Sequence, residues 1–238
     1  MHLPFFYIES FDTTAKTILL DDNTSKHIVQ VLRMKAGEQL NLTDGKGNLL
    51  TCEIAEEHKK RCSVTINSKK QIPNSKKKII IAISLLKNTD RFEWFLEKAT
   101  EIGVSEIFPL ICERTEKEKF RYDRMKGICI SAMLQSRQCW LPILHEPQPF
   151  NHQTIKQFIH SQKLIAHCTN SNKKTISQFP NSQIQNSLIC IGPEGDFTKE
   201  EIELALQNNF VPVSLGETRL RTETAGVVAV ALLCNQSK

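Results

Sequence analysis

The sequence predicts an α/β protein in which a small β-barrel precedes a mostly parallel sheet covered by helices. Up to about residue 70 the chain consists of short strand segments with one helix among them. QIPNSKKK, at residues 71–78, is polar and contains a proline, and it marks a change of pattern. Beyond it, apolar strand segments alternate with helices, which is typical of a parallel sheet with helices on both faces. We therefore expect two domains, residues 1–72 and residues 73–238.

The first domain is expected to contain five strands and one helix. A hairpin turn is predicted at residues 44–47, because the sequence DGKG supplies the Asp-Gly pair that tight turns favour. The helix is predicted in SKHIVQVLRM, where Ile28, Val31 and Leu32 share one face and Thr24 can serve as N-cap. The strand candidates are FFYIE, KTILL, EQLNLT, NLLTCEI and RCSVTI.

The second domain opens with KIIIAISLL, a continuous apolar run of the type that is buried on both faces of a sheet. A helix follows in DRFEWFLEKATEIG, where Asp90 can cap the start and Gly103 can end the helix. In TKEEIELALQNN, Thr198 and Glu201 have the spacing of a capping box. Further helices are predicted in FRYDRMKGICISAMLQSRQ and TETAGVVAVALLCNQ. The remaining strand candidates are EIFPLIC, KLIAHC, SLICI and VPVSL.

Composition and charge restrict the class of protein. The 238 residues carry a formal net charge of +5, which is compatible with a polyanionic partner. No apolar run approaches the roughly 18 residues of a membrane span, and the first residues lack the pattern of a secretory signal. We therefore expect a cytoplasmic protein without a membrane partner. Basic residues gather in one window, which fits either a solvated surface or a nucleic-acid contact. They are Lys59, Lys60, Arg61, Lys69, Lys70, Lys76, Lys77 and Lys78.

The eight cysteines are expected to be reduced thiols. No two of them have the C-x-x-C spacing that zinc sites use, so no metal is expected. Several, among them Cys112, Cys190 and Cys234, lie in apolar runs, as buried thiols of a cytosolic protein do.

Two polar turns that follow predicted strands indicate a binding site. GPEG, at residues 192–195, follows SLICI, and LGETRLRTETA, at residues 215–225, links VPVSL to the last helix. In open parallel sheets, ligands bind beyond the carboxyl ends of strands, and glycines there let a ligand approach the backbone. Either turn alone also suits an ordinary strand-to-helix connection. Together, at neighbouring strand ends, they predict a ligand.

A dehydrogenase on the same kind of sheet does not fit the position of the glycines. A dinucleotide site needs a glycine-rich turn after the first strand of the domain. Here that strand leads into LLKNTDRF, which has no glycine, and a P-loop is also absent.

GPEGDFTKEEI and LGETRLRTETA together resemble the C-terminal signature of the knotted (SPOUT) RNA methyltransferases. DRFEWFLEKATEIGVSEIFPLICERT is similar to that family's first helix and second strand, and HIVQVLRMKAGEQLNLTDGKG to its amino-terminal PUA-like barrel. The match is closest to the branch that methylates N3 of a uridine in 16S ribosomal RNA. The resemblance implies a deep trefoil knot in the C-terminal domain, S-adenosyl-L-methionine as cofactor, the small ribosomal subunit as partner, and a homodimer.

The resemblance also implies that three loops bind a bent cofactor through backbone amides and carbonyls. These are residues 165–167, 191–195 and 215–220, in which Gly192 and Gly216 allow close approach. The implied cofactor-binding residues are Ile165, His167, Ile191, Gly192, Glu194, Gly195, Leu215, Gly216, Leu220, Thr222 and Ala225.

The implied reaction requires uracil N3 to lose a proton, so a base or a stabilising cation is expected. Glu223 is the candidate base, although a glutamate also suits the start of a helix. Arg221 or Arg137 is the candidate stabiliser, although Arg221 also suits a local ion pair. Phosphate contacts that position the RNA are expected from further basic residues. They are His27, Arg33, Lys35 and Arg91.

The chain departs from the family pattern at three places. A basic residue is common very near the family's amino terminus, where this chain has only His2. The family often has a second glycine where Asp196 stands, and an aspartate there can cap the following helix. QSRQ, at residues 135–138, shifts an arginine by one position. Two alternatives stay open: a knotted methyltransferase acting on another RNA position or atom, and a non-catalytic RNA-binding protein of ribosome assembly.

Overall fold

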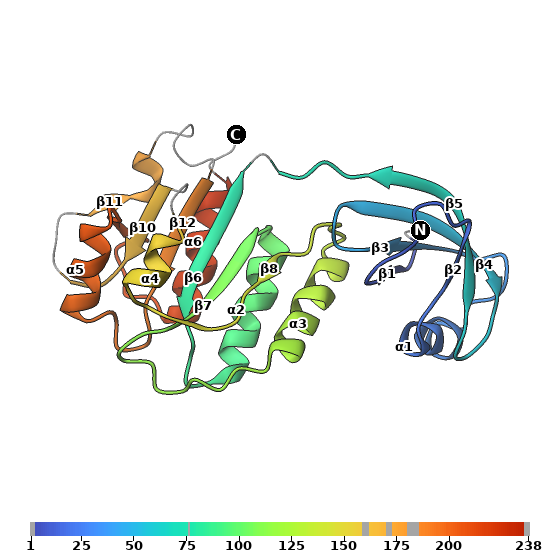
Figure 1. Cartoon of the computed structure of the whole chain (residues 1–238), viewed down its shortest axis with the longest axis horizontal. Coiled ribbons are helices and arrows are strands. Elements are labelled where there is room, and N and C mark those ends of the chain that lie inside the picture. The colour runs from blue at the N-terminus through green and yellow to red at the C-terminus, as the bar shows by residue number, and fades with distance from the viewer. Residues whose placement is uncertain (1–2, 76, 159–161, 170–172, 180–185, 236–238) are drawn as a thin grey trace. The chain divides into compact units, whose positions relative to one another are not determined.

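The chain forms two compact units (Figure 1). A computed structural model describes residues 3–75, 77–158, 162–169, 173–179 and 186–235. Unit 1 comprises Met1–Asn74 and Met133–Leu141, and unit 2 comprises Ser75–Ala132 and Pro142–Lys238. The return of residues 133–141 to unit 1 has no signal in the sequence, because a helix that passes from one unit to the other keeps its local pattern.

Unit 1 is a curled five-stranded sheet with the strand order β1-β3-β4-β5-β2 (Figure 1). β1 runs parallel to β3, and the other neighbours are antiparallel. Leu40, Leu42 and Leu50 are completely buried at its centre. All five predicted strands are confirmed. They are β1 (Phe5–Tyr7), β2 (Thr17–Leu19), β3 (Gln39–Thr43), β4 (Asn48–Glu56) and β5 (Ser63–Gln71).

The predicted hairpin turn between β3 and β4 is also confirmed. Gly45 and Gly47 have φ angles of 69° and 89°, a region that glycine enters at little cost. The Asp44 side chain accepts a hydrogen bond from the Lys46 amide at 2.9 Å. This local bond closes the turn.

The helix of unit 1 differs from the prediction in its start and its winding. It begins as α1 (Asp22–Lys26), and the side chain of Asp21 accepts from the amides of Asn23 and Thr24. The predicted cap at Thr24 is therefore wrong, because an aspartate three residues earlier already binds the free amides.

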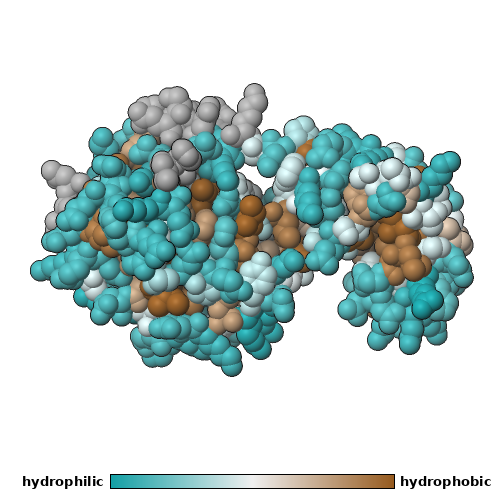
Figure 2. Space-filling model, viewed as in Figure 1, coloured by the Kyte–Doolittle hydropathy of each residue, from teal (hydrophilic) through white to brown (hydrophobic). Residues whose placement is uncertain are grey.

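The chain then continues as the π-helix η1 (His27–Val31). Ile28 is fully buried, whereas Val31 is 65% exposed. The predicted shared face is wrong, because the wider turn of a π-helix rotates Val31 away from the face of Ile28. In the space-filling view, an apolar area lies within the hydrophilic surface of this unit (Figure 2).

In the described residues, unit 2 contains one parallel sheet of eight strands, which confirms the predicted parallel sheet and its five strands and adds the short strands β8, β9 and β11. Its order is β11-β13-β10-β12-β6-β7-β8, and β9 also pairs with β7. The strands are β6 (Lys78–Ser84), β7 (Glu106–Ile111), β8 (Ile143–Leu144), β9 (Gln148–Pro149), β10 (Gln162–Ala166), β11 (Lys174–Thr175), β12 (Asn186–Ile191) and β13 (Val211–Ser214). The trefoil knot that the family resemblance implies stays a prediction.

Helices cover both faces of this sheet. Alternate residues of β6 point to opposite faces, so each face packs against different helices. Ile80 and Ala82 share a core with Ile155 of α4 and Ala205 of α5. The other side packs against α6, which in turn packs on α2. None of the helices in the described part of the chain has the length and apolar character that crossing a membrane requires. The helices are α2 (Thr89–Ile102), α3 (Tyr122–Gln135), α4 (His152–Lys156), η2 (Ile176–Gln178), α5 (Lys199–Gln207) and α6 (Thr222–Asn235).

The helix ends of unit 2 test three sequence predictions. Asn88 caps α2 by accepting from the Asp90 amide at 2.9 Å, so the predicted cap at Asp90 is wrong. The end of α2 at Gly103 is confirmed by its left-handed φ of 101°. The capping box of α5 is confirmed, since Thr198 and Glu201 exchange hydrogen bonds of 3.2 and 2.8 Å.

The predicted burial of the cysteines holds for Cys52, Cys62, Cys112, Cys129, Cys139 and Cys190. Burial raises the pKa of Cys52 and of Cys129 to about 11, so these thiols stay protonated at neutral pH. Two cysteines differ from the prediction. Cys168 is exposed because it lies in a strand-end loop, and Cys234, near the end of α6, is only half-buried.

An ion pair between a buried carboxylate and an exposed lysine joins the starts of β6 and β7. The Glu106 carboxylate contacts the Lys78 ammonium and lies 3.2 Å from Nε2 of His145. The hydrogen bond from His145, followed by the contact with Lys78, holds the pKa of Glu106 below its ordinary value of 4.5, against the opposing effect of burial. A lowered folded-state pKa stabilises the fold above pH 4.5, and this stabilisation is lost as pH falls through the lowered value.

Glu106→Gln is expected to lower the free energy of unfolding at pH 7 by roughly 1–3 kcal/mol, because a charged acceptor is lost. The difference from wild type should shrink below pH 4.5, where the wild-type carboxylate also becomes neutral. Urea unfolding at a series of pH values measures both effects. Glu97→Gln is the control, since Glu97 forms an exposed pair with Lys98 and should change stability by less than about 0.5 kcal/mol. A pH-independent difference for Glu106→Gln would contradict this account.

Candidate active site

Three parallel strands of unit 2 bring their following loops to one edge of the sheet. Ala166, the last residue of β10, is paired with Ile191 at the end of β12 and with Val213 of β13. We call residues 167–169, 192–198 and 215–221 the carboxyl-edge loops. The two turns singled out in the sequence do not follow adjacent strands as expected, because β10 lies between β12 and β13.

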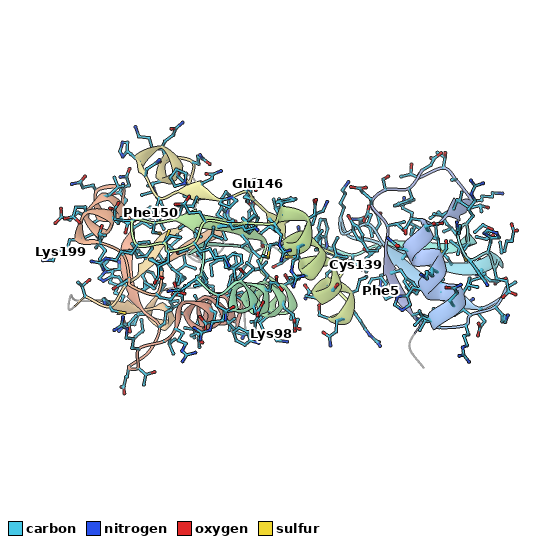
Figure 3. The ribbon with its side chains drawn as sticks, turned by 90° about the horizontal axis from the view of Figure 1, so that it is seen from below. Phe5, Lys98, Cys139, Glu146, Phe150 and Lys199 are labelled. Carbon is cyan, nitrogen blue, oxygen red and sulfur yellow. The ribbon has the colours of Figure 1, made fainter. Side chains whose placement is uncertain are left out.

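The loop after β12 is a tight turn that depends on its first glycine. The Asp196 amide donates to the Pro193 carbonyl at 2.9 Å. A Cβ atom at Gly192 would lie 2.9 Å from the ring of Phe197 and 3.0 Å from its backbone nitrogen. The Phe197 ring is buried and packs on Phe150, with the centroids 5.0 Å apart. Figure 3 shows Phe150 inside unit 2 and Lys199, the first residue of α5, at its edge.

Neighbouring connections hold this turn in place. Nη1 of Arg114, which follows β7, donates to the Gly195 carbonyl at 2.7 Å. The amide of Lys87, which follows β6, donates to Oε1 of Glu194 at 3.2 Å. Neither partner could be predicted from the sequence, since an arginine and a backbone amide in polar loops have no distinctive local pattern.

The loop after β10 contains a buried histidine. Nδ1 of His167 is hydrogen-bonded to the Thr169 hydroxyl, and the Lys173 ammonium donates to the His167 carbonyl. Burial, and then the charge of Lys173, lower the pKa of His167, while Asp196 opposes them. His167 is therefore neutral at pH 7.

Asp196 joins this loop to the turn after β12. Its Oδ2 accepts a hydrogen bond from the Cys168 amide at 2.7 Å. The expectation that Asp196 caps the following helix is wrong, because Thr198 caps α5.

The loop after β13 is more exposed. The Ser214 hydroxyl donates to the Gly216 carbonyl at 2.9 Å. Gly216 has a φ of 151°, and a Cβ atom built there would meet no atom within 4 Å. Glu217 and Arg219 are exposed, whereas Leu215 and Leu220 are half-buried. The Gly216 backbone therefore faces open space.

Glu223 and Arg91 face each other at the starts of α6 and α2. Oε1 of Glu223 lies 3.7 Å from Nε of Arg91, and the Glu223 side chain is 8% exposed. Within the described residues, the buried Oε2 of Glu223 has no hydrogen-bond partner. Because such an atom costs free energy, a donor on a ligand would stabilise it. Arg91, the expected RNA contact, thus pairs with the expected base.

The other candidate cations occupy different positions. The Arg221 carbonyl accepts from the Ala225 amide at 2.7 Å, which places Arg221 just before α6, and its side chain is exposed. Thr222 beside it is buried. Arg137 belongs to unit 1 and has a left-handed φ of 57°. Its catalytic role stays a prediction.

The three RNA-contact candidates of unit 1 lie in and after η1. The His27 ring packs edge-on against Phe6, with the centroids 5.8 Å apart. Arg33 is exposed and has a left-handed φ of 56°. Lys35 is exposed and lies 3.3 Å from a carboxylate oxygen of Glu57. Among the described residues, His, Cys, Asp and Glu side chains form no group of three that could hold a metal ion.

These features define an α/β protein with a ligand site at the carboxyl edge of a parallel sheet. Residues 73–234 match the profile of the RNA methyltransferase domain, and residues 20–67 match that of the RNA methyltransferase PUA domain. The chain belongs to the RNA methyltransferase family.

Known relatives are similar over almost the whole chain. The "Ribosomal RNA small subunit methyltransferase E" of Rickettsia conorii is 28% identical over 222 residues, covering 91% of this chain and 88% of the relative. The enzyme of the same name from Neisseria gonorrhoeae, solved bound to S-adenosyl methionine, is 29% identical with a TM-score of 0.84, covering 97% of this chain and 96% of that one. A "probable rRNA-methyltransferase" from Porphyromonas gingivalis is 38% identical with a TM-score of 0.86, covering 96% and 95%.

Gly192→Ala is expected to lower the free energy of unfolding by about 1–3 kcal/mol, because the new methyl group meets a buried ring and a backbone atom. Gly195→Ala in the same turn is the matched control. Its Cβ would meet only the flexible Arg114 side chain, at 3.2 Å, so a smaller loss is expected. Urea unfolding of both variants makes the comparison. Equal losses would show that close packing at Gly192 does not determine the turn.

Proposed function

We propose that this chain transfers a methyl group from S-adenosyl-L-methionine to N3 of a uridine in 16S ribosomal RNA. The observation that carries the proposal is the meeting of three strand-end loops at one edge of the sheet, with the buried, half-unpaired Glu223 directly after one of them. The cofactor bound to the Neisseria gonorrhoeae relative and the names of the relatives support the cofactor and the RNA.

The residues at this edge fit such a cofactor. The Gly216 backbone faces open space, and Glu194 and Gly195 are exposed. Backbone amides and carbonyls of residues 165–167, 191–195 and 215–220 would hold the cofactor, with Thr222 and Ala225 at the start of α6. The neutral His167 adds no positive charge that would repel a cationic ligand.

When bound, S-adenosyl-L-methionine supplies a methyl group already activated on a sulfonium centre. The contribution of the protein is then mainly to position the uracil and exclude water. Uracil N3 carries a proton at neutral pH, and this proton must leave when N3 gains a carbon substituent. Oε2 of Glu223 is an acceptor without a partner among the described residues, so it would take that proton, while Arg91 on Oε1 keeps the carboxylate oriented.

A cation near the ring oxygens would stabilise the deprotonated uracil. Arg221 is exposed two residues before Glu223 and is the first candidate. Arg137 is the second. Because a paired uridine is inaccessible inside an RNA helix, the target base would be splayed out of its stack.

Unit 1 would bind the surrounding RNA through phosphate contacts, which position the substrate without recognising its sequence. His27, Arg33 and Lys35 are the candidates, and the exposed loop that carries Lys59, Lys60 and Arg61 adds positive charge to the same unit. Lys35 is attached to that loop through Glu57. The RNA would be presented within the small ribosomal subunit.

The chain would act in the cytoplasm as a homodimer. Support for the dimer comes from α6, whose Val227, Val228, Ala231 and Leu232 are only half-buried although the helix is apolar from Ala225 to Cys234. A second copy would cover such side chains favourably. Sedimentation velocity measures the assembly state.

The proposed activity is tested by methyl transfer. The protein is incubated with labelled S-adenosyl-L-methionine and small ribosomal subunits that lack the modification, and the RNA is digested to nucleosides. Label in N3-methyluridine is the expected result. Label in another nucleoside would keep the methyltransferase and change the target. Absence of both label and cofactor binding would favour an RNA-binding protein of ribosome assembly.

Glu223→Gln is expected to lower the single-turnover rate about 10²- to 10⁴-fold, because an amide cannot take the N3 proton. Cofactor and RNA affinities should stay within twofold of wild type. Glu203→Gln is the matched control, since Glu203 is an exposed glutamate on α5, outside the three loops, and should leave the rate unchanged. If Glu223→Gln retained the wild-type rate, Glu223 would not be the base.

Arg33→Ala is expected to weaken RNA binding and to reduce the slope of log K against log salt by about 1, because one phosphate contact is lost. Cofactor affinity should not change. Arg124→Ala serves as control, since the Arg124 guanidinium is already paired with both carboxylate oxygens of Glu93. Filter binding across a salt series measures the slope. An unchanged slope would remove Arg33 from the RNA contact.

A further inference from the structure

Asp196 has a backbone conformation in which a glycine would meet less steric resistance. Its φ of 66° lies in the left-handed region, which residues with a Cβ atom seldom adopt. A residue that keeps a side chain under this strain is commonly held by a contact that the side chain makes. The Asp196 side chain makes such contacts through its carboxylate.

The Asp196 carboxylate uses both oxygens for backbone amides. Oδ2 accepts from Cys168 at 2.7 Å, and Oδ1 accepts from Phe197 at 2.9 Å. The first bond joins two carboxyl-edge loops, and the second fixes the carboxylate on its own turn. Hydrogen bonds to an ionised acceptor are about twice as strong as neutral ones.

The bond to Cys168 begins where the strand ladder stops. The last residue pair between β10 and β12 is Ala166 with Ile191. Two residues beyond Ala166, the Cys168 amide donates to the Asp196 side chain rather than to a carbonyl of a neighbouring strand. The carboxylate therefore continues the attachment of one loop to the other past the end of the sheet.

The far side of the same turn is held independently of Asp196. Arg114 donates to the Gly195 carbonyl, and the Lys87 amide donates to Glu194. Removing the Asp196 side chain should therefore release the loop at residues 167–169 while the turn itself stays in place.

We propose that Asp196 is a positioning residue for the cofactor, which holds the loop at residues 167–169 in its binding conformation. This inference rests on the proposed function, since that loop is one of the three expected to hold S-adenosyl-L-methionine. Asp196 acts through the Cys168 backbone, and no contact of its own with the cofactor is required. Without the bond, binding has to order the loop each time, which lowers the apparent affinity.

The test compares Asp196→Gly with Asn209→Gly. Asn209 also has a left-handed φ, of 64°, and it is exposed after α5, so the second variant repeats the backbone change away from the loops. Asp196→Asn keeps the size and a good tolerance of positive φ, but an amide oxygen can serve only one of the two backbone donors. It guards against a glycine variant that fails to fold.

Calorimetry with S-adenosylhomocysteine, hydrogen exchange of the Cys168 amide and RNA filter binding are the three readouts. We expect Asp196→Gly to raise the Kd at least about tenfold and to speed exchange at Cys168, with RNA affinity unchanged. Asp196→Asn should fall between it and wild type, and Asn209→Gly should match wild type.

A Kd for Asp196→Gly within twofold of wild type would overturn the proposal, even if Cys168 exchanged faster. Equal losses in Asp196→Gly and Asn209→Gly, or a parallel loss of RNA binding, would overturn it too, because they would indicate a general loss of structure. If the wild-type chain did not bind S-adenosylhomocysteine, the proposed function would fail, and with it the cofactor role of Asp196. If the wild-type chain bound S-adenosylhomocysteine normally and Asp196→Gly bound it equally well, only the cofactor role of Asp196 would fail.

Discussion

The site depends on the parallel pairing of β10 with two strands at once. β12 binds one edge of β10 and β13 binds the other, and both ladders reach Ala166. Parallel pairing sends all three chains out of the sheet in the same direction. The buried side chains of Leu164 and Ile165 hold β10 in this central position. The three carboxyl-edge loops meet because of this arrangement, and no loop sequence could bring them together without it.

Beyond the ends of the strands, the backbone needs other partners, because polar groups leaving a buried sheet must still form hydrogen bonds. Asp196, Arg114 and the amide of Lys87 supply contacts that hold the turn after β12. Glu223 stands in contrast, since its Oε2 has no partner among the described residues. The backbone of the turn is held by hydrogen bonds, and Oε2 of Glu223 can accept a hydrogen bond from a ligand without a rearrangement of the fold. Preorganisation of this kind favours catalysis.

Long periodic segments could be predicted from the sequence because their pattern is local. The five longer strands of the parallel sheet, the end of α2 at Gly103 and the capping box of α5 follow from residues close together in the chain. The errors arise where two local solutions compete. Asp21 is chosen over Thr24 as a cap, and the π-helix turns Val31 out of the core. Very short elements such as β8 and β11 have too few residues for any period to show.

The sequence by itself determined the class of fold, the family and two turns. These turns are the glycine-rich turn at residues 192–195 and the arginine-containing turn at residues 215–225. All of these features depend on residue types within single short segments. Only the tertiary structure decided that β10 separates β12 from β13, that Asp196 binds Cys168, and that Arg91 faces Glu223. The physical reason is that each of these contacts joins segments far apart in the chain. The free energy that selects them comes from packing the whole sheet and its helices, which no local pattern records.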